Sequence, residues 1–239
     1  MEIQIAVSKI NKYAVSESGD TLEIVERPGG GVSIVLADGQ SSGRGAKAVS
    51  MMVVRRVIGL LAEGVRDGAA ARAASDYLFS ERNGKVSSTL NIISVDLSSE
   101  TVVLARNNEV PMYVARGDSI ECFDEPSRSI GTARNIKPLI SEVPIQKDLT
   151  LVVYSDGLSH AGKRRGTPMD VETTLRGLLE DSDPAPQALA DALLAQAMHL
   201  DDNRPVDDIS VVVLRVVTHS GDDVRRMSVR VPINIKNGG

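Results

Sequence analysis

Apolar and polar residues alternate in the first forty residues with a period close to two, which is typical of β-strands. Residues 3–15 form one such run. Residues 21–39 contain two apolar runs on either side of Pro28 and three glycines, a pattern that predicts a hairpin. The second of these runs stops at Asp38 and Gly39.

The period then changes to that of a helix. Over residues 42–66 apolar side chains recur at spacings of three and four, with Ser41 or Ser42 as the capping residue and Gly68 as a stop signal. A second helix is predicted over residues 69–82.

Short β-prone runs follow, separated by turn signals. They cover residues 86–97, 101–107, 111–117 and 119–125. Their spacing predicts an antiparallel meander. A further apolar run begins at residue 149 and ends at Asp156 and Gly157, so that an Asp-Gly pair follows an apolar strand for the second time.

The last third of the chain predicts two helices, a strand and an additional hairpin strand. The expected ranges are 169–181, 184–200, 207–217 and 224–231, in that order. Asp183 is the expected cap of the second helix, with Pro184 in its first position. Residues 232–239 are expected to be a flexible tail.

Together these elements predict an α+β fold in which sheets lie between helical layers. The length of 239 residues suits one large domain, which we place at residues 1–231.

The charge and hydropathy of the chain exclude some classes of function. A net charge of −5 without a basic stripe argues against a nucleic-acid partner. No apolar stretch approaches the ~18 residues of a membrane span, and we expect a cytoplasmic protein.

Acidic residues stand where apolar strands begin or end. They are Asp20, Asp38, Asp156 and the pair Asp207-Asp208. A single Asp-Gly after a strand usually marks only a turn. The evidence for a functional site is therefore the series of acidic residues taken together. Carboxylates brought together repel one another unless a cation compensates, and Mg²⁺ or Mn²⁺ prefer such oxygen ligands. Four carboxylates carry a charge of about −4, which two divalent ions would balance. Such a site favours attack of a metal-activated water on a phosphate ester.

Other site chemistries find less support. No Gly-rich segment matches a nucleotide-binding P-loop, and no D-x-D motif indicates a haloacid-dehalogenase phosphatase. Three scattered histidines and the single Cys122 do not indicate a zinc site. His160 follows Asp156 closely, and we interpret it as a solvent-exposed loop residue rather than a general acid.

The ordered segments "SGD", "VLADG", "VVYSDGL" and "DDISVVVL" resemble the metal-dependent serine/threonine protein phosphatases, the PPM or type 2C class. Among these, the chain is most similar to the bacterial SpoIIE-like branch, over about residues 5–217. The resemblance implies a four-layer α-β-β-α sandwich with two antiparallel sheets flanked by helix pairs. It also implies two Mn²⁺ or Mg²⁺ ions in a cleft between the sheet edges.

The resemblance also implies roles for individual residues. Asp38 would bridge both ions, Gly39 would offer its carbonyl to one of them, and Asp20 would ligate that ion or orient its water. Asp156 and Asp207 would hold the other ion. The remaining implied residues are the supporting Asp208 and Gly157, and Arg44 or Lys47 as a phosphate-binding cation or, more simply, a solvated helix start.

Three departures from the family pattern affect substrate specificity more than chemistry: "DGQSSGRG", "ARNNEVP" and "SDGLSHAG". We therefore expect a phosphoserine/phosphothreonine phosphatase in which metal-bound hydroxide attacks phosphorus directly. The branch implies a phosphorylated STAS protein, an antagonist of an anti-sigma factor, as substrate, and a stand-alone catalytic domain like the stressosome feedback phosphatases. Two alternatives remain open: a pseudophosphatase or regulatory binding module of the same fold, and a phosphatase of small phosphoesters.

Overall fold

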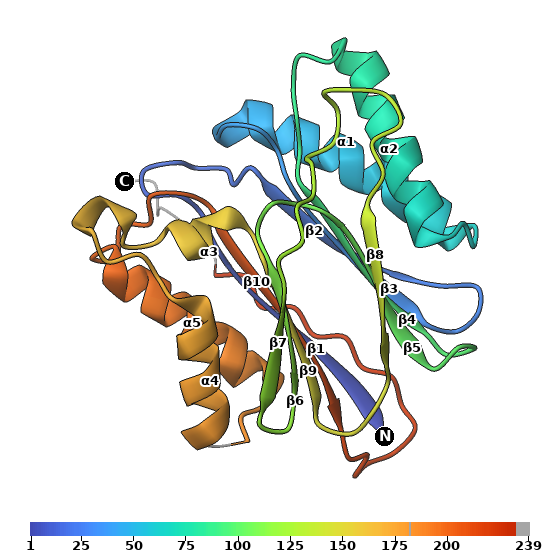
Figure 1. Cartoon of the computed structure of the whole chain (residues 1–239), viewed down its shortest axis with the longest axis vertical. Helices are drawn as coiled ribbons and strands as arrows, with labels where there is room; N and C mark the ends of the chain where they lie inside the picture. Colours follow the sequence, from blue (N-terminus) through green and yellow to red (C-terminus); the bar gives the residue numbers. More distant parts are fainter. Residues whose placement is uncertain (182, 233–239) are drawn as a thin grey trace, which may run out of the picture.

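Two antiparallel β-sheets of five strands each pack face to face in residues 1–181 and 183–232, the part of the chain that the computed structural model describes (Figure 1). The first sheet consists, in spatial order, of β1 (Glu2–Ile10), β10 (Ile209–Val217), β9 (Leu149–Tyr154), β6 (Met112–Arg116) and β7 (Ser119–Phe123). The second consists of β2 (Asp20–Glu26), β3 (Val32–Asp38), β4 (Leu90–Asp96), β5 (Thr101–Asn107) and β8 (Leu139–Pro144).

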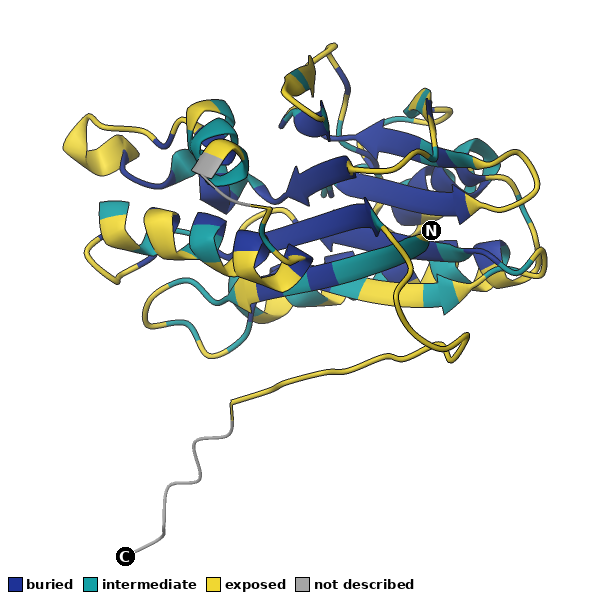
Figure 2. Ribbon diagram, turned by 90° about the horizontal axis from the view of Figure 1, so that it is seen from below, coloured by how far each residue is buried: buried dark blue, intermediate teal, exposed yellow. Residues whose placement is uncertain are grey.

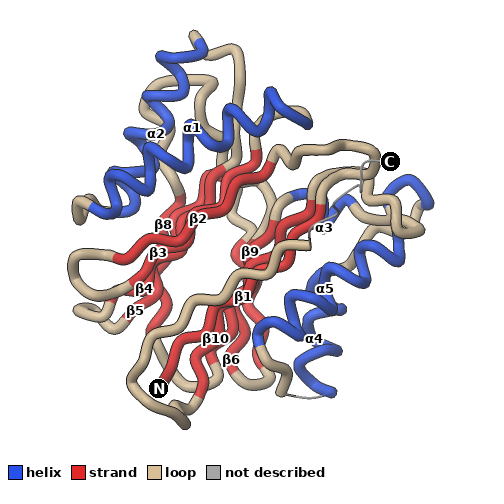
Figure 3. Tube along the Cα trace, turned by 180° about the vertical axis from the view of Figure 1, so that it is seen from behind, coloured by secondary structure: helices blue, strands red, loops and turns tan. Residues whose placement is uncertain are grey.

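Helix pairs cover the two outer faces of this double sheet (Figure 3). Helices α1 (Gly43–Ala62) and α2 (Asp67–Arg82) pack on the second sheet, and α4 (Val171–Asp181) and α5 (Pro186–Leu200) pack on the first. A short helix α3 (Asp156–His160) follows β9 directly, and a 3₁₀ turn follows at Lys163–Arg165. The layer order is α-β-β-α, which confirms the expected four-layer sandwich.

The central strands are apolar without interruption because both of their faces are covered. In β3, Ile34 and Leu36 point toward the opposite sheet, whereas Val35 and Ala37 pack against α1 and α2. This is the alternation of a strand, with both sides buried. Figure 2 shows the resulting continuous buried layer in the strands, with exposed residues on the outer turns of the helices.

The expected end of α1 was wrong by several residues. The helix ends at Ala62, and Gly64 adopts a left-handed conformation with φ +84°. The Gly64 N–H donates to the Leu61 carbonyl, and the Val65 N–H donates to the Leu60 carbonyl, which closes the last turn. Gly68, the expected stop, lies inside α2.

The expected start of α5 was also wrong. Asp183 does not cap the helix, because its carboxylate accepts a 2.7 Å hydrogen bond from Nη2 of the buried Arg215 on β10. The carbonyl of Pro184 accepts a second bond from the same guanidinium. Residues 183–185 are thereby tied to the sheet, and Pro186 takes the first helical position.

The predicted meander is divided between the two sheets. β5 belongs to the second sheet and β6 to the first, so the chain crosses over between Asn107 and Met112. The strand β8, which pairs with β5, was not predicted. It is an edge strand whose side chains are mostly exposed or half-buried, and its apolar pattern is therefore weak.

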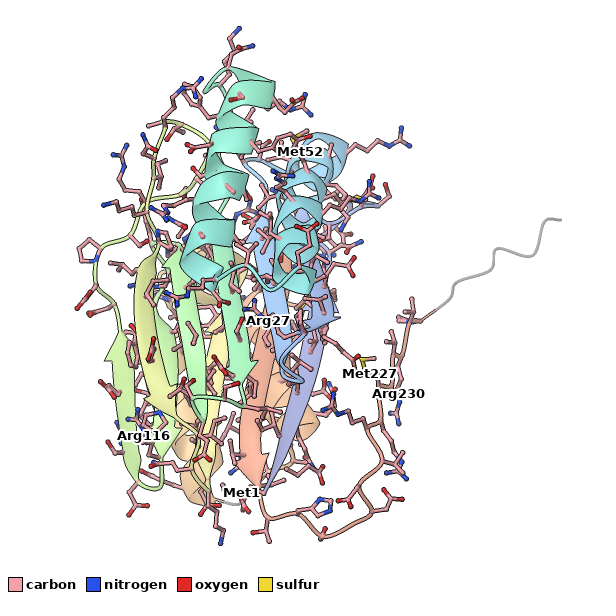
Figure 4. All side chains as sticks on the ribbon, turned by 90° about the vertical axis from the view of Figure 1, so that its right-hand side faces the viewer. Met1, Arg27, Met52, Arg116, Met227 and Arg230 are labelled. Carbon is pink, nitrogen blue, oxygen red and sulfur yellow. The ribbon has the colours of Figure 1, made fainter. Side chains whose placement is uncertain are left out.

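The additional strand expected at residues 224–231 does not form. Residues 218–232 are exposed and follow an extended path beside the sandwich, on which Met227 and Arg230 are labelled (Figure 4). A hairpin partner for β10 has no place to pair, because β10 already lies between β1 and β9. Most of the expected tail, residues 233–239, lies outside the described residues. None of the helices in the described part of the chain has the length and hydropathy needed to cross a membrane.

Candidate metal and phosphate site

The acidic residues expected at strand ends meet at one end of the sandwich. Asp38 ends β3 and faces Asp20, the first residue of β2, in the antiparallel register. Asp156 opens α3 immediately after β9, and Asp207 lies just before β10. Asp38, Asp156 and Asp207 line one cleft of about 330 Å³. The two sheets thus contribute carboxylates to the same space.

Asp20 is fully buried and links the two sheets. Its Oδ2 accepts a 2.5 Å hydrogen bond from the Ser210 hydroxyl on β10. Its main-chain carbonyl accepts hydrogen bonds from Lys9 Nζ at 2.6 Å and Lys47 Nζ at 2.8 Å. The Oδ1 atom is buried and has no hydrogen-bond partner among the described residues.

Burial and the neighbouring negative charges raise the pKa of three of these acidic residues. Burial, together with the charges of Asp20, Asp156 and Asp207, raises the pKa of Asp38 to about 9. Burial also raises the pKa of Asp20 to about 6 and raises the pKa of Asp207. Negative charge is therefore costly at this position unless a cation balances it.

The donor set fits hard divalent cations. Two buried carboxylate oxygens, Asp20 Oδ1 and Asp156 Oδ1, receive no hydrogen bond from the described residues. Such orphaned oxygens are unfavourable in a protein interior and are the ligand type that Mg²⁺ and Mn²⁺ prefer. The residues present are therefore suited to hold the ions that the sequence predicts.

Two glycines permit the close packing around these acids. A Cβ on Gly39 would lie 2.0 Å from the Ala46 carbonyl oxygen on α1. A Cβ on Gly157 would lie 2.1 Å from the Asp208 carbonyl oxygen. Any side chain at either position would push the adjacent loop away from the carboxylates. Close main-chain packing therefore explains why glycine follows aspartate in both Asp-Gly pairs.

Asp208 fastens the neighbouring loop instead of entering the cleft. Its carboxylate accepts the main-chain N–H of Lys12 at 2.9 Å and of Gly19 at 2.7 Å. Both oxygens are therefore used, and the residue is buried. Asp208 is absent from the cleft lining, whereas Asp207 is part of it.

The two basic residues considered for phosphate binding do not line the cleft. The Arg44 side chain is 93% exposed, and its nearest carboxylate is that of Glu17, at 3.9 Å. Lys47 Nζ donates to the Asp20 carbonyl and, at 3.0 Å, to the Thr21 hydroxyl. Lys47 therefore positions the start of β2.

Lys12 is the basic residue that lines the cleft, and the sequence interpretation missed it. Residues 3–15 were expected to be one strand, but β1 ends at Ile10. The following loop is held by the Tyr13 N–H, which donates to the Pro205 carbonyl at 2.9 Å. The Asn11-Lys12 pair, which interrupts the alternation, was the only sequence signal for this loop.

Hydroxyl and amide side chains form much of the remaining cleft wall. The residues are Gln40, Ser41, Ser42, Ser87, Ser88, Thr89 and Ser129. The sequence placed those of "DGQSS" in the loop over the metals, whereas residues 87–89 and Ser129 were missed. The Ser88 hydroxyl and the Thr89 N–H both donate to the Asp38 carbonyl, at 2.8 and 2.9 Å. Gln40 Oε1 accepts the Ser87 N–H at 2.9 Å. The unusual "DGQSS" sequence thus joins the end of β3 to residues 87–89.

His160 lies beside two of the acidic residues, Asp156 and Asp207. It ends α3, one turn after Asp156, and its Nδ1 is 3.7 Å from Asp156 Oδ2. One potential ligand atom from each of Asp156, His160 and Asp207 lies within 4.8 Å of the others. The side chain is 37% exposed. The interpretation as a loop histidine was therefore wrong in its location, since His160 borders the site.

The double sheet, with a helix pair on each outer face, is the fold of the PP2C-type phosphatase domains among solved structures. A family model described as "Stage II sporulation protein E (SpoIIE)" matches residues 28–217. The chain belongs to the SpoIIE family, which confirms the resemblance found in the sequence. One curated relative is stage II sporulation protein E of Priestia megaterium, 22% identical over 200 residues. The match covers 83% of this chain and 34% of the relative, so the chain spans about a third of that protein.

Solved structures share the fold. The PP2C phosphatase domain of SpoIIE from Bacillus subtilis, with a fragment of its regulatory domain, superposes with a TM-score of 0.79 at 20% identity. The match covers 90% of this chain and 64% of that one. The catalytic domain of the serine/threonine phosphatase PstP, crystallised with two manganese ions, gives a TM-score of 0.69 at 17% identity, over 90% and 99% of the two chains. RsbX, crystallised with magnesium, superposes with a TM-score of 0.66 at 15% identity, and the match covers 89% of this chain and 94% of RsbX.

Proposed function

We propose that this chain is a metal-dependent phosphatase that removes phosphate from phosphoserine or phosphothreonine in a protein. The observation that carries the proposal is the convergence of carboxylates from both sheets on one cleft, together with two buried oxygens, Asp20 Oδ1 and Asp156 Oδ1, that have no hydrogen-bond partner among the described residues. Membership of the SpoIIE family supports the same reaction.

We assign the ligands from this geometry and from the family pattern. Asp38 pairs with Asp20 in the register of β2 and β3 and shares the cleft with Asp156 and Asp207, so we assign it as the residue shared by two ions. Gly39 would add its carbonyl to the ion near Asp20. When bound, the ions would lower the pKa of a coordinated water and neutralise charge on the phosphoryl oxygens.

The protein's own groups would position the phosphate. Lys12 offers a positive charge at the edge of the cleft, and the hydroxyls of residues 41, 42, 87 and 129 offer hydrogen bonds to phosphoryl oxygens. These donors lie on loops from both halves of the sandwich. They would orient the phosphoryl group toward the carboxylates without forming a covalent phosphoenzyme.

The finer proposal is that the substrate is a phosphorylated STAS protein that antagonises an anti-sigma factor. It rests on the SpoIIE family membership and on the likeness to RsbX and to an RsbU domain of Mycobacterium tuberculosis. We further propose that residues 1–231 act as one catalytic domain.

The test is hydrolysis of a phosphoserine peptide and of p-nitrophenyl phosphate with Mn²⁺, with Mg²⁺ and with chelator. Wild type is compared with Asp38→Asn and Asp156→Asn, and we expect both variants to lose at least about 100-fold in kcat/KM. Asp118→Asn is the matched control, because Asp118 lies in the exposed turn between β6 and β7 and does not line the cleft. This control is expected to keep full activity.

The outcomes separate the alternatives. Activity on the small ester but not on phosphopeptides or a phosphorylated STAS protein would identify a small-molecule phosphatase. A folded protein with no activity in any metal would identify a binding module and overturn the proposal.

A further inference from the structure

His160 and Asp156 occupy the same face of α3. They are four residues apart, so one helical turn brings their side chains together. The distance from His160 Nδ1 to Asp156 Oδ2 is 3.7 Å, and among the described residues the imidazole makes no hydrogen bond. The Nδ1 atom therefore faces the Asp156 carboxylate and is not engaged by another described residue.

Asp207 completes a three-residue group from two different segments. One ligand atom from each of Asp156, His160 and Asp207 lies within 4.8 Å of the other two. Metal–ligand bonds of about 2.1 Å hold ligand atoms about 3–4 Å apart, so side-chain rotation is sufficient to close this group around an ion. Two ligands four residues apart on one helical face are a recurrent metal-binding arrangement.

A surface ion pair is the simplest other interpretation of this contact. The two side chains are about a third exposed, and an ion pair this exposed contributes little to stability. An ion pair also leaves the buried Asp156 Oδ1 without a hydrogen-bond partner among the residues that the structure describes. A cation shared with Asp207 would satisfy this oxygen as well as the imidazole.

We propose that His160 supplies an imidazole nitrogen to the cation held by Asp156 and Asp207. This inference rests on the metal site of the proposed function and deepens it. An imidazole is a softer ligand than a carboxylate, so this position would favour transition-metal ions over Mg²⁺. The other position, which Asp20, Asp38 and the Gly39 carbonyl would form, would offer oxygen ligands only. The two positions would therefore differ in metal preference.

The experiment uses the full chain loaded with Mn²⁺ and observed by pulsed electron paramagnetic resonance, which detects ¹⁴N nuclei bound to manganese. Wild type is expected to show ¹⁴N coupling, and His160→Gln is expected to lose it. His199→Gln is the matched control, because His199 is an exposed residue in the last turn of α5. That variant should keep the signal.

Calorimetric titration provides the second measurement. In His160→Gln the affinity of one Mn²⁺ site should fall by at least about tenfold, while Mg²⁺ affinity changes less than about threefold. Bound Mn²⁺ without ¹⁴N coupling in the wild type, or equal losses for both metals, would overturn the inference and leave the proposed function intact. No Mn²⁺ binding by the folded wild type would overturn both.

Discussion

At the scale of single residues, the carboxylates of the cleft oppose folding in the absence of metal. The raised pKa of Asp38 means that the folded protein binds a proton there more tightly than the unfolded chain does. The group therefore stabilises the fold below its ordinary pKa of 3.8, and this contribution is lost as the pH rises toward about 9. Asp20 acts in the same direction, with a pKa of about 6.

This reasoning predicts a pH-dependent effect of Asp38→Asn on the metal-free protein. In chelator, the variant should gain stability relative to wild type as the pH rises from 5 to 9, because asparagine never acquires the buried charge. Urea unfolding followed by circular dichroism at pH 5, 7 and 9 measures the difference. With saturating Mn²⁺, wild type should be the more stable of the two proteins. A constant difference across this pH range would show that Asp38 does not titrate as described.

A second residue-scale prediction concerns Lys12, the basic side chain in the cleft lining. Lys12→Met should raise KM for a phosphoserine peptide by about tenfold, because it removes a charge that faces the phosphate. Arg44→Met is the matched control and should leave KM unchanged, since Arg44 is exposed outside the cleft. Steady-state kinetics of both variants test the assignment. The opposite ranking would place the phosphate near the start of α1.

At the scale of elements, the crossover between the two sheets depends on buried polar contacts. Arg106 near the end of β5 donates from Nη1 to the Asn108 carbonyl at 2.7 Å and from Nη2 to the Glu125 carbonyl. Asn107 Nδ2 donates to the carbonyls of Arg128 and Lys137, at 3.1 and 3.2 Å. The departure "ARNNEVP" thus secures the loop that leads to β8.

We predict that Arg106→Leu lowers the free energy of unfolding by about 1–3 kcal/mol, because buried carbonyls lose their donor. Arg116→Leu should cost about 0–1 kcal/mol, since the ion pair of Arg116 with Glu121 is at the surface. Urea unfolding of both variants provides the comparison. Equal effects would mean that the crossover is held by apolar packing alone.

At the scale of the whole molecule, the sandwich is complete at β10. Residues 218–232 are exposed, and their contacts with the body are surface pairs such as Arg225 with Glu26 at 3.6 Å and His219 with Glu2 at 3.2 Å. The cleft lies at one end of the sheets and includes no residue of this segment.

Removal of residues 219–239 is therefore expected to change the free energy of unfolding by less than about 1 kcal/mol. Metal-dependent hydrolysis should also be retained. Urea unfolding and the phosphopeptide assay compare the shortened and full chains. A marked loss of stability would show that the C-terminal segment packs on the sandwich in solution.

Much of the fold was predictable because burial on two faces leaves a clear local pattern. The apolar runs of β3, β9 and β10 and the helical spacing of α1 identified the elements, and the acids at strand ends indicated the candidate site, where Asp38, Asp156 and Asp207 share one cleft. The weakly patterned edge strand β8 was missed. Lys12 and the hydroxyl residues 87–89 were missed because loops carry no periodicity, and their approach to Asp38 depends on how distant segments pack.

The sequence by itself determined the kinds of elements, the two-sided burial of the central strands and the ordered acidic positions, since these depend on local spacing and side-chain chemistry. Only the tertiary structure decided which sheet each strand joins, because periodicity reveals a buried face but not the partner against it. The same long-range packing brought Lys12 into the cleft and His160 beside Asp156 and Asp207. It also left residues 224–231 unpaired, because both edges of β10 were already occupied.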